Sequence, residues 1–267
     1  MKQPRVNRIF KLLLLIIGVV SLLLLAFVGY VFFKSPAAIR FPQFEHAHFR
    51  MQLLVNGKAE NFGHEAYQAS YKPQQCSDEL TKEPIHFHDK KDQFVHLHWK
   101  KLTGGMVLKY YGWNKIGGLE EVLGYRFDGV WHFQPVPIYG SVLPALSKDT
   151  TLYVYSGDET HFKRRDLNDF LLQDVETFFN KASNVQPEES ISWFDALSSK
   201  VIAHDDEAPG LKAETTKNPE KSPEELTRIN NLLGNVVLFA QKDEPTQEEI
   251  KARFAKLVPL SDSTCGG

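Results

Sequence analysis

Apolar residues run without a charged residue from position 12 to position 33. At 1.5 Å of rise per residue, a helix of this length spans about 30 Å, the thickness of the hydrocarbon core of a bilayer. A cleaved signal peptide would carry a shorter apolar stretch of about 7–15 residues, followed by small residues at the cleavage site. Here Phe32 and Phe33 lead directly to Lys34. The pattern therefore predicts a transmembrane helix at 12–33.

The charges that flank this run predict its orientation. Residues 1–11 contain no acidic residue, and their basic residues are Lys2, Arg5, Arg8 and Lys11. Basic residues next to a membrane-spanning helix favour the cytoplasmic side. We therefore expect a cytoplasmic tail at 1–11 and a single-pass anchor in the cell membrane, whose partner is the lipid bilayer. The chain after residue 34 would then be extracytoplasmic.

After a spacer at 34–44, apolar and polar residues alternate, as is typical of half-buried strands. This pattern predicts a β-rich domain at 45–135, with strands at 48–55, 85–89 and 94–99. Asn56-Gly57 and Asp128-Gly129 are dipeptides that favour tight hairpin turns, because both turn residues tolerate positive φ. A short helix is predicted at 103–113, with Thr103 as its N-cap.

The pattern changes after residue 135. A strand at 151–157 and an amphipathic helix at 166–182 predict an α+β region at 136–200. Residues 201–221 are polar and charged, which predicts a linker or exposed loop. The last region, 222–267, is predicted as helix, strand and helix.

Capping residues define the elements of that last region. Ser222-Pro223 is a typical helix start, and Gly234 is the predicted stop of that helix. A strand follows at 235–241, and Thr246 with Glu249 caps a final helix that reaches about residue 257. The fold class that follows is α+β: an N-terminal transmembrane helix, a β-rich ectodomain and C-terminal helices.

The net charge of the chain bears on the kind of partner that it could bind. Net charge is -2, and because the N-terminal tail is basic, the outer region is weakly acidic. This balance argues against nucleic acid as a partner.

The two cysteines, Cys76 and Cys265, are predicted to form a disulfide in an oxidising compartment, which would stabilise the fold by about 4–5 kcal/mol on the chain-entropy model. Free thiols are the alternative, and no CxxC spacing supports a cysteine metal site.

Histidines carry the main chemical signal of the chain. Three His-x-His pairs occur, formed by His46 and His48, His86 and His88, and His96 and His98. Alternate residues of a strand project from the same face, so each pair places two imidazoles side by side. If the strands at 85–89 and 94–99 form a hairpin with His88 opposite His96, all four rings share one face.

Such a face predicts a transition-metal site, because imidazole nitrogens suit Zn or Cu better than Ca or Mg. We take His86, His88, His96 and His98 as the primary ligands and His46 and His48 as a second pair. The alternative interpretation is that these histidines are polar residues of a solvated or hydrogen-bonded strand face.

Four segments also resemble an uncharacterised family of membrane-anchored extracytoplasmic proteins of bacteria and archaea. They are HAHFRMQLLVNG (46–57), PIHFHD (84–89), FVHLH (94–98) and LTGGMVLKYYG (102–112). Thr103-Gly104 departs from the Thr-Leu that this family carries at the helix start. The resemblance covers about a quarter of the chain and implies an ectodomain with clustered histidines, without an established reaction.

Three functions are consistent with the sequence. The first is a membrane-tethered, extracytoplasmic and non-catalytic metal-binding protein. The second is a structural or interaction module whose partner is another protein of the cell envelope. The third is a metal-dependent enzyme, for which the nearest acidic residues are Glu45, Asp89 and Asp92. We find no catalytic triad, and the sequence favours a non-catalytic role.

Overall fold

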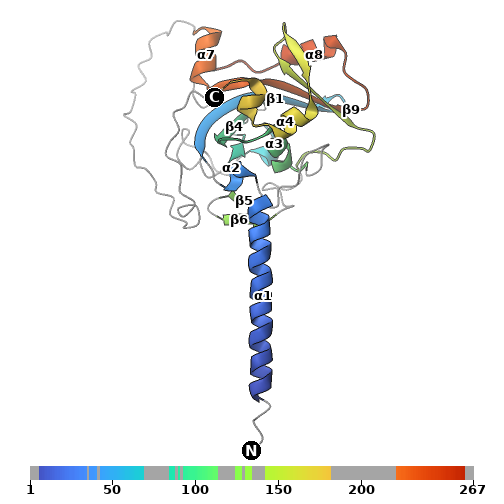
Figure 1. The fold of residues 1–267 in the computed structure, drawn as a ribbon. Coiled ribbons are helices and arrows are strands. Elements are labelled where there is room, and N and C mark those ends of the chain that lie inside the picture. Colours follow the sequence, from blue (N-terminus) through green and yellow to red (C-terminus); the bar gives the residue numbers. More distant parts are fainter. Residues whose placement is uncertain are drawn as a thin grey trace, which may run out of the picture.

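A computed structural model describes residues 6–34, 36–40, 43–68, 84–87, 90, 93–113, 124–127, 130–133, 142–181 and 221–261. Helix α1 (Val6–Lys34) extends away from the rest of the molecule (Figure 1). Its segment Arg8–Phe33 has 26 residues, and the most apolar stretch of 18 residues within it has a mean hydropathy of 3.1. The predicted apolar helix is therefore present, and it is long and apolar enough to cross a membrane.

Most strands form one seven-stranded mixed sheet, in the order β3-β4-β1-β9-β7-β8, with β2 beside β1. All neighbouring pairs are antiparallel except β1 and β9, which are parallel. The strands are β1 (Phe44–Val55), β2 (Lys58–Ala59), β3 (Ile85–His86), β4 (Phe94–Trp99), β7 (Thr151–Gly157), β8 (Phe162–Arg165) and β9 (Leu232–Gln241).

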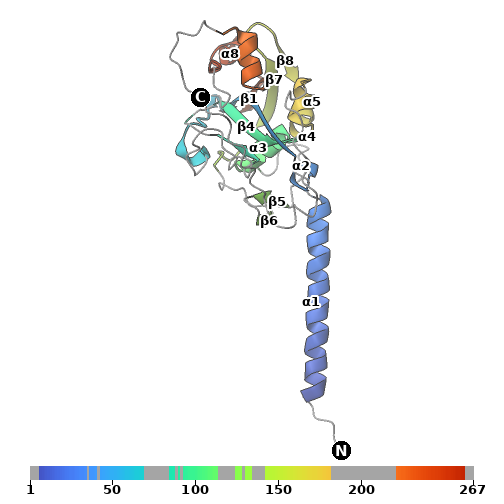
Figure 2. The same cartoon turned by 90° about the vertical axis from the view of Figure 1, so that its left-hand side faces the viewer.

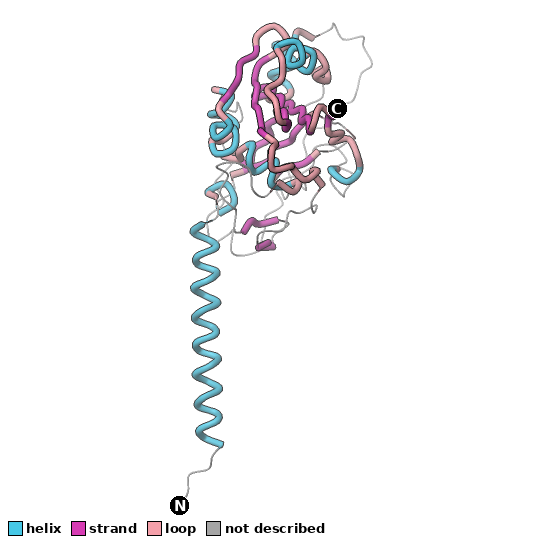
Figure 3. The backbone as a smooth tube through the Cα atoms, turned by 90° about the vertical axis from the view of Figure 1, so that its right-hand side faces the viewer, coloured by secondary structure: helices cyan, strands magenta, loops and turns pink. Residues whose placement is uncertain are grey.

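Short elements surround this sheet (Figure 3). A second, two-stranded sheet is formed by β5 (Gly124–Phe127) and β6 (Val130–Phe133). This hairpin and α2 (Ala37–Arg40) lie near the end of α1 in both side views (Figures 1 and 2). A 3-10 turn, η1 (Glu65–Tyr67), follows β2.

Alternation along β1 separates the two faces of the main sheet. Ala47, Phe49, Met51 and Leu53 belong to the larger hydrophobic core, together with residues of α3 (Gly104–Tyr110), α4 (Leu167–Leu172) and α5 (Val175–Phe179). On the opposite face, Leu54 packs in a smaller core with Ile250 and Phe254 of α8 (Gln247–Phe254). The histidines of β1 lie on this second face, toward the other end of the strand.

Local signals in the sequence correctly predicted several of these elements. Asn56 and Gly57 have φ values of 50° and 79°, and the turn between β1 and β2 uses both. Thr103 caps α3, because its side chain accepts a hydrogen bond from the Met106 amide at 3.1 Å. Strands β4 and β7 have the predicted bounds, and α8 begins with the capping box of Thr246 and Glu249.

The prediction of one helix at 166–182 was wrong. Helix α4 ends at Leu172, and α5 begins at Val175 after Gln173 and Asp174, which have extended backbone conformations. Asp174 is an N-cap, and its carboxylate accepts a hydrogen bond from the Thr177 amide at 2.8 Å. The Val175 amide donates to the Leu102 carbonyl at 2.9 Å. This tertiary bond and the cap together outweigh the continuous helical pattern of the sequence.

Gly234 was also predicted to stop the preceding helix, and this was wrong. Helix α7 (Pro223–Ile229) begins at the Ser222 cap as expected and ends at Asn230. Gly234 lies inside β9, at a register irregularity between β9 and β1. A Cβ atom at this position would lie 2.3 Å from the Phe179 ring. The glycine therefore permits a close approach between β9 and α5.

The three predicted segments of the outer region contribute to the same sheet. Strands β1 to β4 come from 45–135, β7 and β8 from 136–200, and β9 from 222–267. The boundaries at residues 135 and 200, and nearly all of the predicted linker at 201–221, lie outside the described residues. Cys76 and Cys265 also lie outside them, so their pairing stays a prediction.

Packing between α3 and α4 gives a test of this core. A Cβ atom at Gly104 would lie 2.2 Å from a ring carbon of Phe170. We expect Gly104→Ala to reduce the free energy of unfolding by about 1–3 kcal/mol through overpacking, despite better helix propensity. Thermal unfolding of the detergent-solubilised protein measures the effect. Gly18→Ala is the matched control, because nothing lies within 4 Å of its Cβ position; equal melting temperatures for the two variants would contradict the packing.

Candidate metal centre

Three adjacent strands, β1, β4 and β3, bring five of the predicted histidines together. Strand β4 is central, with His96 paired to His48 on β1 and to His86 on β3. His98 follows His96 by two positions, and His46 precedes His48 by two, so both project from the same face as their neighbours. We call the five residues His46, His48, His86, His96 and His98 the histidine ring.

The predicted pairing of β3 with β4 was wrong by two residues. The prediction placed His88 opposite His96, whereas the structure pairs His86 with His96 and Ile85 with Leu97. A shift of two residues preserves the face on which the side chains lie, so the imidazoles still converge. Phe87 is also bridged to Gln68, and this second contact, absent from the hairpin argument, holds β3 in its register. His88 lies outside the described residues.

The five imidazoles form a closed cycle of neighbouring rings. Centroid separations are 4.5 Å for His46 and His48, 4.3 Å for His48 and His96, 5.1 Å for His96 and His86, 4.5 Å for His86 and His98, and 5.2 Å for His98 and His46. Each ring therefore lies against at least two others, and His46 also stacks on His96 across the cycle at 5.8 Å. Alternation along a single strand places only two imidazoles side by side. The cycle forms because three neighbouring strands, β1, β4 and β3, contribute histidines to the same face.

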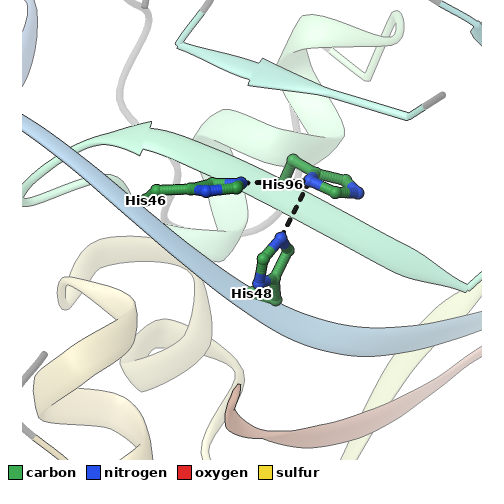
Figure 4. Close-up of side chains that lie close together, drawn as sticks. All are labelled: His46, His48 and His96. Carbon is green, nitrogen blue, oxygen red and sulfur yellow. Dashed lines mark hydrogen bonds between the residues drawn. The ribbon is translucent and has the colours of Figure 1, made fainter. Parts of the chain in front are cut away.

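Two triads within the histidine ring have the spacing of metal ligands. The ligand nitrogens of His46, His48 and His96 lie within 4.8 Å of one another, and so do those of His86, His96 and His98. In the first triad, Nδ1 of His96 is 3.5 Å from Nε2 of His46 and 2.9 Å from Nε2 of His48 (Figure 4). Two nitrogens bound tetrahedrally to one ion at 2.0–2.1 Å would be about 3.3–3.4 Å apart. Small side-chain rotations are enough to reach that geometry.

The backbone carbonyl of Asn230 orients His48. This carbonyl oxygen contacts Nδ1 of His48, and because a carbonyl only accepts hydrogen bonds, Nδ1 must donate its hydrogen. The lone pair of His48 is then on Nε2, the nitrogen that faces His96. A hydrogen bond of this kind, from the far nitrogen to a backbone carbonyl, commonly sets the tautomer and orientation of metal-binding histidines.

Asn230 is held firmly at the junction between α7 and β9. Its side chain is fully buried, and its Nδ2 donates to the carbonyls of Leu226 and Ser261, both at 2.8 Å. The next residue, Asn231, donates from Nδ2 to the His46 carbonyl at 2.8 Å. The start of β9 is therefore joined to the histidine-bearing part of β1 by side-chain as well as backbone bonds.

Burial and charge define the surroundings of the histidine ring. His86 and His96 are 0% exposed, His48 is 1% exposed and His98 is 3% exposed, whereas the sequence argument allowed for a solvated face. On the same face of β1, Arg50 donates from Nε to Oδ1 of Asn235 at 2.7 Å and from Nη1 to the Val258 carbonyl at 2.6 Å. Burial lowers the pKa of Arg50 below its ordinary value. Its bonds tie β1 to β9 and to the segment after α8.

Among the described residues, no carboxylate belongs to either triad. Two of the acidic residues considered from the sequence, Asp89 and Asp92, lie outside the described part of the chain. An all-nitrogen donor set suits Zn or Cu and is a poor match for Ca or Mg, which prefer oxygen ligands. His161, by contrast, has a side chain that is 90% exposed and lies far from the site in sequence, next to β8.

Comparison with protein-family models, with curated protein sequences and with solved structures found no match to this chain. The family resemblance noted in the sequence therefore stays a prediction. The site is defined here by its own geometry, in which the contribution of Asn230 was not visible from the sequence. Asn is an ordinary helix-ending residue, and its carbonyl reaches His48 only through the β1–β9 pairing.

Asn230 offers a direct test of this arrangement. We expect Asn230→Ala to lower the free energy of unfolding by about 1–3 kcal/mol, because the buried Asn230 side chain is lost and two part-buried carbonyls lose their donor. The measurement is thermal or chemical unfolding of the full-length protein. Asn168→Ala is the control, because Asn168 is exposed on α4. If the two variants unfolded alike, the Asn230 side chain would have no part in holding the α7–β9 junction.

Proposed function

We propose that this protein is a membrane-tethered, extracytoplasmic protein that binds a transition metal, Zn or Cu, through the histidine ring. The observation that carries the proposal is the convergence of two histidine triads from three strands, each with nitrogens within 4.8 Å. Imidazole nitrogens donate their lone pairs to transition-metal ions such as Zn and Cu. His88 stays a candidate ligand on the sequence alone.

The membrane-tethered part of the proposal rests on α1. Its apolar segment meets the length and hydropathy of a membrane span. Lys2, Arg5, Arg8 and Lys11 favour a cytoplasmic N-terminus and an extracytoplasmic location for the sheet. An oxidising location would also agree with the predicted pairing of the two cysteines.

Burial supports binding rather than catalysis. A catalytic zinc site usually combines three protein ligands with an open position that a substrate can reach, and with a nearby general base. The imidazoles of His86, His96 and His98 are almost completely buried, which limits access to any ion that they hold. Storage, buffering, sensing or stabilisation by metal are the roles that fit such a site.

The alternative is a metal-free structural module that binds another protein of the envelope. The specific observation in its favour is the hydrogen bonding of His48, whose two ring nitrogens contact the Asn230 carbonyl and His96. Hydrogen bonds of this kind can satisfy buried imidazoles without a metal. In that case, metal would neither be retained nor stabilise the protein.

Metal content and stability distinguish these functions. The full-length protein is extracted with detergent from washed membranes, and its metals are measured by elemental mass spectrometry. We expect bound zinc or copper, and a melting temperature that falls when a chelator removes it, because a ligand that binds only the native state stabilises it. His48→Ala/His96→Ala should lose the metal and the chelator effect.

His161→Ala is the matched control, because His161 is exposed and outside the histidine ring. It should retain metal like the wild-type protein. The proposal fails if the wild-type protein binds neither zinc nor copper and its melting temperature is unchanged by chelator and by added metal. Recovery of the protein only in the soluble fraction would contradict the membrane anchor.

A further inference from the structure

The two triads of the histidine ring share one residue. His46 and His48 complete the first triad, His86 and His98 complete the second, and His96 belongs to both. The first triad lies where β1 pairs with β4, and the second lies where β3 pairs with β4. His46 and His48 come from β1 on one side of β4, whereas His86 comes from β3 on the other side and His98 from β4 itself, so His96 lies between the two sets.

The two ring nitrogens of His96 face different directions. Nδ1 is the nitrogen close to Nε2 of both His46 and His48, at 3.5 Å and 2.9 Å. Figure 4 shows the other nitrogen of the His96 ring on the side that points away from these two residues. Each imidazole nitrogen can offer one lone pair, so one ring can bind two ions only through different nitrogens.

The second triad is arranged around the same ring. His86 stacks on His96 with a centroid separation of 5.1 Å and an interplanar angle of 12°. His98 approaches His86 edge-on at 4.5 Å. His86 and His98 thus form one pair, and His46 and His48, which are themselves 4.5 Å apart, form another; the two pairs meet where His98 lies 5.2 Å from His46.

Building on the metal-binding function proposed above, we propose that the histidine ring is a two-ion centre in which His96 bridges two transition-metal ions. Nδ1 of His96 joins His46 and His48 around one ion, and Nε2 of His96 joins His86 and His98 around the other. Each ion receives three imidazole nitrogens. When both ions bind, His96 gives up its ring hydrogen to solvent, as ligands do on metal binding, and the bridging imidazolate reduces the repulsion between the two cations.

Copper titration of the full-length protein in detergent tests this proposal, because Cu(II) is both countable and paramagnetic. Metal-free protein is loaded with excess Cu(II), desalted, and analysed by elemental mass spectrometry and electron paramagnetic resonance. We expect two copper ions per chain, with a spin signal well below that of two isolated ions, since a bridging imidazolate couples the two spins.

Paired substitutions separate the two halves of the centre. His46→Ala/His48→Ala and His86→Ala/His98→Ala should each retain one copper ion, with the full signal of an isolated Cu(II). His161→Ala, the exposed control, should retain two coupled ions. If a double variant does not fold, the ion count and the spin signal of the wild-type protein decide the question by themselves.

Three results would overturn the bridged centre. One copper ion per chain, lost in either double variant, would indicate a single-ion site and leave the proposed metal-binding function intact. Two copper ions with the full spin signal of isolated ions would show that His96 is not shared. The absence of any bound copper or zinc would instead contradict the metal-binding function on which this inference rests.

Discussion

The parallel pairing of β1 with β9 holds the main sheet and the histidine ring together. It joins residues 48–55 to residues 232–240, segments that are far apart in the sequence. On its other edge, β1 pairs with β4, which carries His96 and His98. Strand β1 therefore links β9 to the histidine-bearing strand β4. The same pairing brings the end of α7 to the histidine face, where the Asn230 carbonyl contacts His48. Without β9, His48 would lose its orienting partner, and each of the two hydrophobic cores would lose the apolar side chains that β9 contributes to it.

This architecture explains how a polar cluster can be buried. One face of the sheet packs against α3, α4 and α5, and the end of the other face packs against α8. The histidine ring occupies the remaining part of that second face, beside Arg50 and its bonds to Asn235 and Val258. A buried polar group that loses its partner costs about 1–3 kcal/mol. Five buried or half-buried imidazoles therefore need partners, and the hydrogen bonds of His48 to His96 and to the Asn230 carbonyl are two of the contacts that supply them.

Sequence patterns predicted the features that are decided within a few residues. The apolar run of α1, the strict alternation of β4, the Asn56-Gly57 turn and the Thr103 and Thr246 caps depend on neighbours along the chain. The patterns failed where a tertiary contact decides the outcome. Helix formation stops at Gln173, where Val175 bonds to Leu102, and Gly234 lies within β9, where Phe179 packs closely against it.

In the histidine ring, too, local features were predictable from the sequence and tertiary ones were not. Strand alternation was enough to place the imidazoles of each His-x-His pair on one face. It was not enough to show that the pair on β1 lies directly beside β4, since the 40 or so intervening residues allow many pairings. The β3 register was likewise missed by two residues, because it depends on the bridge between Phe87 and Gln68.

X-ray absorption spectroscopy of the metal-loaded, full-length protein is the most direct test of the central claim that the histidine ring binds a transition metal. We expect a first shell of nitrogen atoms at about 2.0–2.1 Å around zinc, together with the outer-shell scattering of several imidazole rings. A first shell made of oxygen or sulfur atoms, or one without imidazole scattering, would contradict it.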